Sequence, residues 1–190
     1  MTRKILLTLA SLFLIGQSYK LAVLIPKLGA ESWGAAIFLG WLISLFITGI
    51  FAFAGFAWPT QRLMPEAYYK VYYPKRLKRI GKALNIELFR KMLLATLWKN
   101  RERQKEFFDG TKDRLENLET QSKKSEFGHL IPFIIIQALS VYWFTIGLIK
   151  LGIATFVFNI AGNIYPVILQ RNHRMRIQVM KRRLQSKSRV

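Results

Sequence analysis

The chain has 190 residues, of which 52% are hydrophobic, and its mean hydropathy is positive at +0.18. This apolar content argues against an ordinary soluble domain, and four long stretches nearly free of charge exclude a nucleic-acid-binding module despite the formal net charge of +20. We interpret residues 1–190 as a single all-α integral membrane domain with four transmembrane helices. The sequence contains no cysteine, and its two histidines leave little for a zinc centre.

The first apolar run covers residues 5–25 and is long enough to cross ~30 Å of hydrocarbon as a helix. It follows Arg3 and Lys4, as the apolar part of a signal peptide would. No small-residue cleavage site follows before Pro26, which favours an uncleaved anchor. Lys20 lies near the end of the run, so we interpret it as snorkelling outward, with a counter-ion or proton site as the alternative.

The second apolar run covers residues 32–58 and carries no charge. Trp33 and Trp58 lie at its two ends, where interfacial tryptophans are typical. The third and fourth runs cover residues 130–149 and 153–169. Only Lys150 to Gly152 separate them, so they are expected to form a tight helical hairpin.

Positive charge is distributed unequally between the two sides of these runs. Seventeen Lys and Arg lie in residues 59–129, and eight more lie in the basic tail 170–190. The turns on the opposite side carry few cations. The positive-inside rule therefore places both termini and residues 59–129 in the cytoplasm, as expected for a multi-pass protein of the cell membrane or inner membrane.

The segment 59–129 is too long to be a structureless loop. A tyrosine-rich stretch at residues 68–73, followed by a run of cations, suits the headgroup region of an anionic leaflet. The spacing of apolar residues predicts an amphipathic helix over residues 85–108, a break at residues 109–111 and then a shorter polar helix that leads to Glu126.

Glu126 and His129 are three residues apart at the start of the third span and share one helix face. A carboxylate beside an imidazole can orient the ring and raise its basicity, which a general base needs in order to take a proton from an alcohol. The alternative is a polar cap at the membrane interface.

A polar stripe marks the end of the fourth span, where Gln170 and Arg174 each fall within about 20° of Asn163 on a helix. The short hairpin brings this end close to the start of the third span. We therefore expect the stripe to converge with Glu126 and His129 on one cytoplasmic pocket. The alternative is that these amides form interhelical hydrogen bonds.

Glu-x-x-His before one span and Asn-x-Tyr-Pro-x-x-x-Gln-Arg-x-x-Arg-x-Arg at the end of the next resemble the glycosyl-4,4'-diaponeurosporenoate acyltransferase family over residues 126–176. The resemblance implies transfer of a fatty acyl group to a sugar hydroxyl of a glycosylated lipid or carotenoid. It makes His129 the base, with Glu126 holding its ring and Asn163 or Gln170 stabilising the oxyanion. Arg171, Arg174 and Arg176 would bind the phosphates of an acyl-CoA or acyl-carrier donor.

The resemblance implies no cofactor and no metal beyond that acyl donor as co-substrate. The His-x-x-x-x-Asp signature of glycerolipid acyltransferases does not follow either histidine. The competing interpretation is a non-catalytic membrane scaffold or accessory subunit, whose arginines contact anionic lipids. In both interpretations the partners are membrane lipids, and protein partners stay open.

Overall fold

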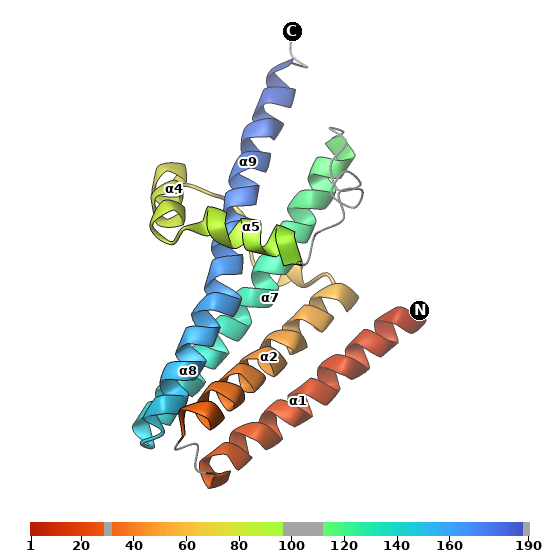
Figure 1. Ribbon diagram of the computed structural model, residues 1–190. Coiled ribbons are helices and arrows are strands. Elements are labelled where there is room, and N and C mark those ends of the chain that lie inside the picture. Colours follow the sequence, from red (N-terminus) through yellow and green to blue (C-terminus); the bar gives the residue numbers. More distant parts are fainter. Residues whose placement is uncertain (29–31, 97–111, 188–190) are drawn as a thin grey trace. The chain divides into compact units, whose positions relative to one another are not determined.

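The computed structural model of the protein describes residues 1–28, 32–96 and 112–187 (Figure 1). These residues form helices, turns and loops without a strand, which confirms the all-α prediction. Four of the helices are long and apolar enough to cross a membrane. The chain divides into two compact units, which we name the apolar unit (residues 1–60 and 127–166) and the basic unit (residues 61–126 and 167–190).

The apolar unit begins with α1 (Thr2–Leu28) and α2 (Trp33–Ala57), which lie side by side (Figure 1). The side chain of Ser32 accepts a hydrogen bond from the backbone N–H of Ala35, so this serine caps α2 at the predicted boundary. Trp58 ends the helix, and its indole Nε1 donates to Thr8 of α1 at 3.2 Å. The first two spans are therefore present close to their predicted limits.

The second half of the apolar unit is a helical hairpin made by the end of α7 (Lys112–Thr145) and by α8 (Ile149–Asn159). Its turn lies at residues 146–148, so the predicted turn at Lys150 to Gly152 is wrong. Gly147 explains the shift, because it adopts a left-handed φ of 83° that other residues rarely adopt. The predicted turn residues are instead helical, and the Gly152 carbonyl accepts a hydrogen bond from Ser140.

After α8 the helix widens into a π-helical turn, η2 (Ile160–Ile164), before it continues as α9 (Tyr165–Lys187). The apolar unit buries a compact cluster between its helices, while many of its large side chains, such as Phe13, Phe38 and Phe56, remain exposed. Exposed phenylalanines in this number suit lipid and not water, which agrees with a membrane protein. The buried cluster consists of Ile25, Ala36, Ile43, Ile47, Ile136, Trp143 and Leu151.

Within the part of the chain that the structure describes, the basic unit contains four short helices, the first part of α7 and most of α9. The short helices are η1 (Thr60–Leu63), α3 (Glu66–Tyr69), α4 (Pro74–Ala83) and α5 (Ile86–Thr96). Pro74 occupies the first turn of α4, where its missing N–H costs nothing. Asn85 makes the turn into α5 with a left-handed φ of 48°, which asparagine tolerates.

Two helices of the basic unit continue into the membrane spans. The predicted polar helix that leads to Glu126 is the first part of α7, which runs unbroken from Lys112 to Thr145. The fourth span likewise continues into the predicted basic tail as far as Lys187. The predicted amphipathic helix over residues 85–108 begins as α5 and its remainder, like the predicted break at residues 109–111, lies outside the described residues.

Candidate functional site

The predicted site residues belong to two different polar groups, one in each unit. His129 and Asn163 lie in the apolar unit, whereas Glu126, Gln170, Arg171, Arg174 and Arg176 lie in the basic unit. We describe each group within its own unit.

The group in the apolar unit is a chain of neutral side chains that we name the amide relay: His129, Asn163, Asn159 and Thr48. Nδ1 of His129 lies 3.2 Å from Oδ1 of Asn163. The side-chain amide of Asn163 lies 3.0 Å from Oδ1 of Asn159 and 3.2 Å from the hydroxyl of Thr48. Both asparagines are buried, and His129 is half-buried.

The far end of the amide relay fixes the direction of its hydrogen bonds. The backbone carbonyl of Phe133 can only accept, so the amide of Asn159 donates to it at 3.0 Å. Oδ1 of Asn159 then accepts from the amide of Asn163, which leaves Oδ1 of Asn163 to accept from His129. This order puts the proton of neutral His129 on Nδ1 and leaves a lone pair on Nε2, the arrangement that a general base needs.

The π-helical turn η2 holds Asn163, and the helical path through it brings Asn163 beside Asn159, four residues earlier. The N–H of Tyr165 reaches back to the carbonyl of Ile160, which marks the wider turn. π-Helical turns inside α-helices are frequent at functional sites, and the helix here departs from regular geometry where its amides meet the histidine.

The group in the basic unit is charged, and we name it the ion cluster: Glu126, Arg171, Arg174 and Tyr68. The carboxylate of Glu126 is fully buried. It accepts hydrogen bonds from the Tyr68 hydroxyl and from Nε of Arg171, each at 2.8 Å, and forms an ion pair with Arg174. Glu126 is thus held by two guanidinium groups and a phenol, while the hydrogen-bond partner of the His129 Nδ1 atom is Asn163.

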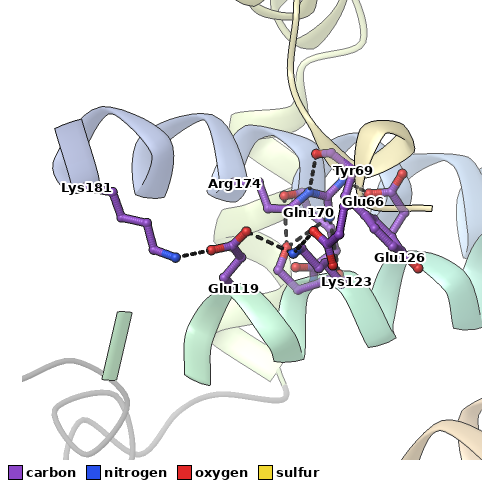
Figure 2. Close-up of polar contacts among 9 residues, drawn as sticks. Glu66, Tyr69, Glu119, Lys123, Glu126, Gln170, Arg174 and Lys181 are labelled. Carbon is purple, nitrogen blue, oxygen red and sulfur yellow. Dashed lines mark hydrogen bonds and ion pairs between the residues drawn. The ribbon is translucent and has the colours of Figure 1, made fainter. Parts of the chain in front are cut away.

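Arg174 is the most deeply buried cation of the ion cluster, with 1% of its surface exposed (Figure 2). Its Nε donates to the carbonyl of Tyr69 at 3.1 Å, and its Nη1 lies 3.3 Å from the hydroxyl of Ser122. With Nη2 paired to Glu126, the guanidinium is occupied by groups of the protein. Binding of a donor phosphate by Arg174 stays a prediction, and these contacts favour a structural role instead.

A second ionic network borders the ion cluster (Figure 2). Lys123 pairs with Glu66 at 2.6 Å and with Glu119 at 3.0 Å, and Glu119 also pairs with Lys181. Burial raises the pKa of the neighbouring Tyr69 to about 12, so its phenol is neutral at physiological pH. These contacts tie α3 and the first part of α7 to α9 within the basic unit.

The other predicted residues are more accessible. Arg171 is about one-third exposed and Arg176 is exposed. The backbone carbonyl of Gln170 accepts from the hydroxyl of Ser122 at 3.1 Å, and its side chain is half-buried. No group of three or more potential ligand side chains that could hold a metal ion occurs in residues 1–28, 32–96 and 112–187.

Sequence reasoning missed two kinds of residue in these groups. Asn159 and Thr48 escaped notice, although Asn159 lies four residues before Asn163 and therefore on the same helix face. Tyr68 and Tyr69 were predicted to lie among lipid headgroups, but Tyr69 is buried and Tyr68 donates to Glu126. A buried carboxylate needs hydrogen-bond donors, and a tyrosine in a stretch rich in cations, such as Tyr68, is a residue that can supply one.

The chain matches no curated protein and no solved structure. One protein-family model, described as glycosyl-4,4'-diaponeurosporenoate acyltransferase, matches residues 65–183. This range spans more than half of the chain and contains the whole ion cluster and every member of the amide relay except Thr48. The chain therefore belongs to the glycosyl-4,4'-diaponeurosporenoate acyltransferase family.

Proposed function

We propose that the protein is a membrane acyltransferase that moves a fatty acyl group from a thioester donor to a sugar hydroxyl of a glycosylated lipid or carotenoid. Family membership supports the reaction class. The observation that carries the proposal is the amide relay, which leaves Nε2 of His129 free to accept a proton. An ordinary interfacial histidine would not need two buried asparagines to fix its tautomer.

In the proposed reaction, Nε2 of His129 removes the proton of the acceptor hydroxyl as its oxygen attacks the thioester carbonyl. The C–O bond forms, the tetrahedral intermediate collapses, and the C–S bond breaks. The imidazolium then returns the proton to the leaving thiolate, so the base is regenerated without a covalent acyl-enzyme. Asn163 already donates its amide hydrogens to Asn159 and Thr48, which disfavours it as the oxyanion donor, and the role of Gln170 stays a prediction.

We further propose that this chemistry takes place at the cytoplasmic face of the cell membrane, with both termini and the basic unit in the cytoplasm. The excess of Lys and Arg in residues 59–129 and 170–190 supports this orientation. An acyl-CoA or acyl-carrier donor made in the cytoplasm would reach the protein from that side.

The test is acyl transfer by the purified full-length protein, with acyl-CoA and a glycolipid as substrates, before and after His129→Ala. We expect the rate to fall by about 10² to 10⁴-fold, which is what a general base supplies. Ile134→Ala provides the control, because this side chain is exposed on the same helix and should leave the rate unchanged. Unchanged turnover in His129→Ala would contradict the role of His129 as the base, and absence of turnover in the wild-type protein would favour a scaffold.

A further inference from the structure

A cavity of about 690 Å³ lies within the basic unit, lined by α4, α5 and α9. Its volume is typical of pockets that bind small molecules, which measure about 300–1,000 Å³. Gly81 lets α4 approach α9 at this point, since a Cβ atom there would lie 3.2 Å from the Asn172 amide nitrogen. The left-handed turn at Asn85 then folds α5 back along another side of the cavity.

The lining of this cavity is strongly basic. It contains Lys78, Lys82, Arg90 and Arg176, and Lys78 and Lys82 share a face because they are four residues apart on α4. Among the described lining residues, Glu87 is the one carboxylate, and Nε of Arg90 donates to it at 3.1 Å. These hydrogen bonds hold the pKa of Glu87 below its usual value. Lys78, Lys82 and Arg176 therefore supply positive charge that the lining itself does not neutralise.

Much of the remaining lining is apolar and comes from α9 and the start of α5. Leu169, Met175 and Val179 line the cavity from α9, and Ile86 lines it from the start of α5. A site for a free inorganic anion would have no need of this surface. Cations beside an apolar wall suit an amphiphile that carries both phosphate groups and a hydrocarbon part.

We propose that this cavity binds the phosphate-bearing part of the acyl donor, a phosphorylated acyl thioester such as acyl-CoA, and that Lys78, Lys82 and Arg176 contact its phosphates. The assignment rests on the proposed function, whose donor class it specifies. The sequence analysis also predicts Arg176 as a phosphate ligand. The proposal adds Lys78 and Lys82 of α4 as phosphate ligands, whereas Arg174 belongs to the ion cluster.

The test measures binding and not turnover. The full-length protein in phosphatidylcholine nanodiscs is titrated with a non-hydrolysable thioether analogue of acyl-CoA and, separately, with the matching acyl-pantetheine, which lacks phosphate. Replacing Lys78 and Lys82 together by Gln should raise the Kd for the acyl-CoA analogue about tenfold or more, because charge-assisted hydrogen bonds are lost. The Kd for acyl-pantetheine should stay the same.

The matched control replaces Lys75 and Arg79 by Gln, since these cations lie on the same helix, are exposed and do not line the cavity. The control removes the same charge and should leave both Kd values unchanged. Equal effects of the two double variants, or equal effects on both ligands, would overturn the proposal. In parallel, phosphatidylglycerol is added to the nanodiscs. A Lys78/Lys82 variant that loses affinity for this anionic lipid, but not for the acyl-CoA analogue, would also overturn the proposal in favour of a lipid-headgroup site.

Binding and turnover are both measured on the wild-type protein and on His129→Ala, which separates this proposal from the proposed function. Donor binding without turnover in the wild-type protein would contradict the acyltransferase assignment and leave the cavity assignment unaffected. Turnover that depends on His129, with donor binding unaffected by Lys78 and Lys82, would do the reverse.

Discussion

The amide relay and the ion cluster both provide hydrogen-bond partners for buried polar side chains, but the partners are neutral in the relay and charged in the cluster. The relay uses neutral side chains and ends on a ring nitrogen that the hydrogen bonds leave unprotonated. The ion cluster uses full charges, and the buried Glu126 and Arg174 are paired with each other and hydrogen-bonded by neighbouring groups of the protein. A buried charge paired in this way is not accessible to a substrate, whereas the relay leaves one lone pair on the imidazole ring.

This difference changes how the motif Glu-x-x-His is understood. Sequence spacing suggests that Glu126 orients His129, but the carboxylate is engaged by Tyr68, Arg171 and Arg174. The ring is oriented by Asn163. In our account Glu126 stabilises the fold and His129 performs the chemistry, so changes at the two positions should have different consequences.

The largest expected effect is all-or-none and concerns the side of the membrane on which each unit lies. Cysteine introduced at Lys75, in the exposed part of α4, should not react with an impermeant thiol reagent applied to intact cells. Cysteine at Lys27, exposed at the end of α1, should react. Because the natural sequence has no cysteine, each variant carries a single thiol. The reverse labelling pattern would place the basic unit on the outer side.

The next largest effect is expected in the ion cluster. Glu126→Gln leaves Arg174 buried without its counter-charge, which typically costs about 3–5 kcal/mol. The measurement is thermal unfolding of the full-length protein in detergent. Glu87→Gln is the matched control, because its pair with Arg90 is exposed and worth little. A Glu126→Gln protein as stable as wild type, with acyl transfer abolished, would contradict the structural role.

A smaller effect is expected in the amide relay. Asn159→Leu removes the donor to the Phe133 carbonyl and frees the Asn163 amide to turn, at a cost of about 1–3 kcal/mol for groups left unpaired. We expect kcat to fall while the KM for the donor stays constant, since Asn159 positions the base and does not bind the donor. An equal rise in KM with unchanged kcat would show that the relay serves binding.

The spans and the polar stripe could be predicted from sequence because hydropathy and helical periodicity are local properties. Ser32 and Trp58 bound α2 as predicted, and Asn163 is buried as its depth in the span requires. The hairpin turn was misplaced because Gly147 and Gly152 look alike in sequence, and only the structure shows which of them takes a positive φ. The partners of Glu126 could not be predicted, since Tyr68 is 58 residues away from it.

The tautomer of His129 tests the central claim most directly. The protein has two histidines, so His173→Gln leaves His129 as the single histidine for ¹⁵N NMR of the neutral ring. Our account predicts a proton on Nδ1 and none on Nε2, with the preference weakened in Asn159→Leu. A ring protonated on Nε2, or a mixture of tautomers that Asn159→Leu leaves unchanged, would contradict the claim that the amide relay prepares His129 as a base.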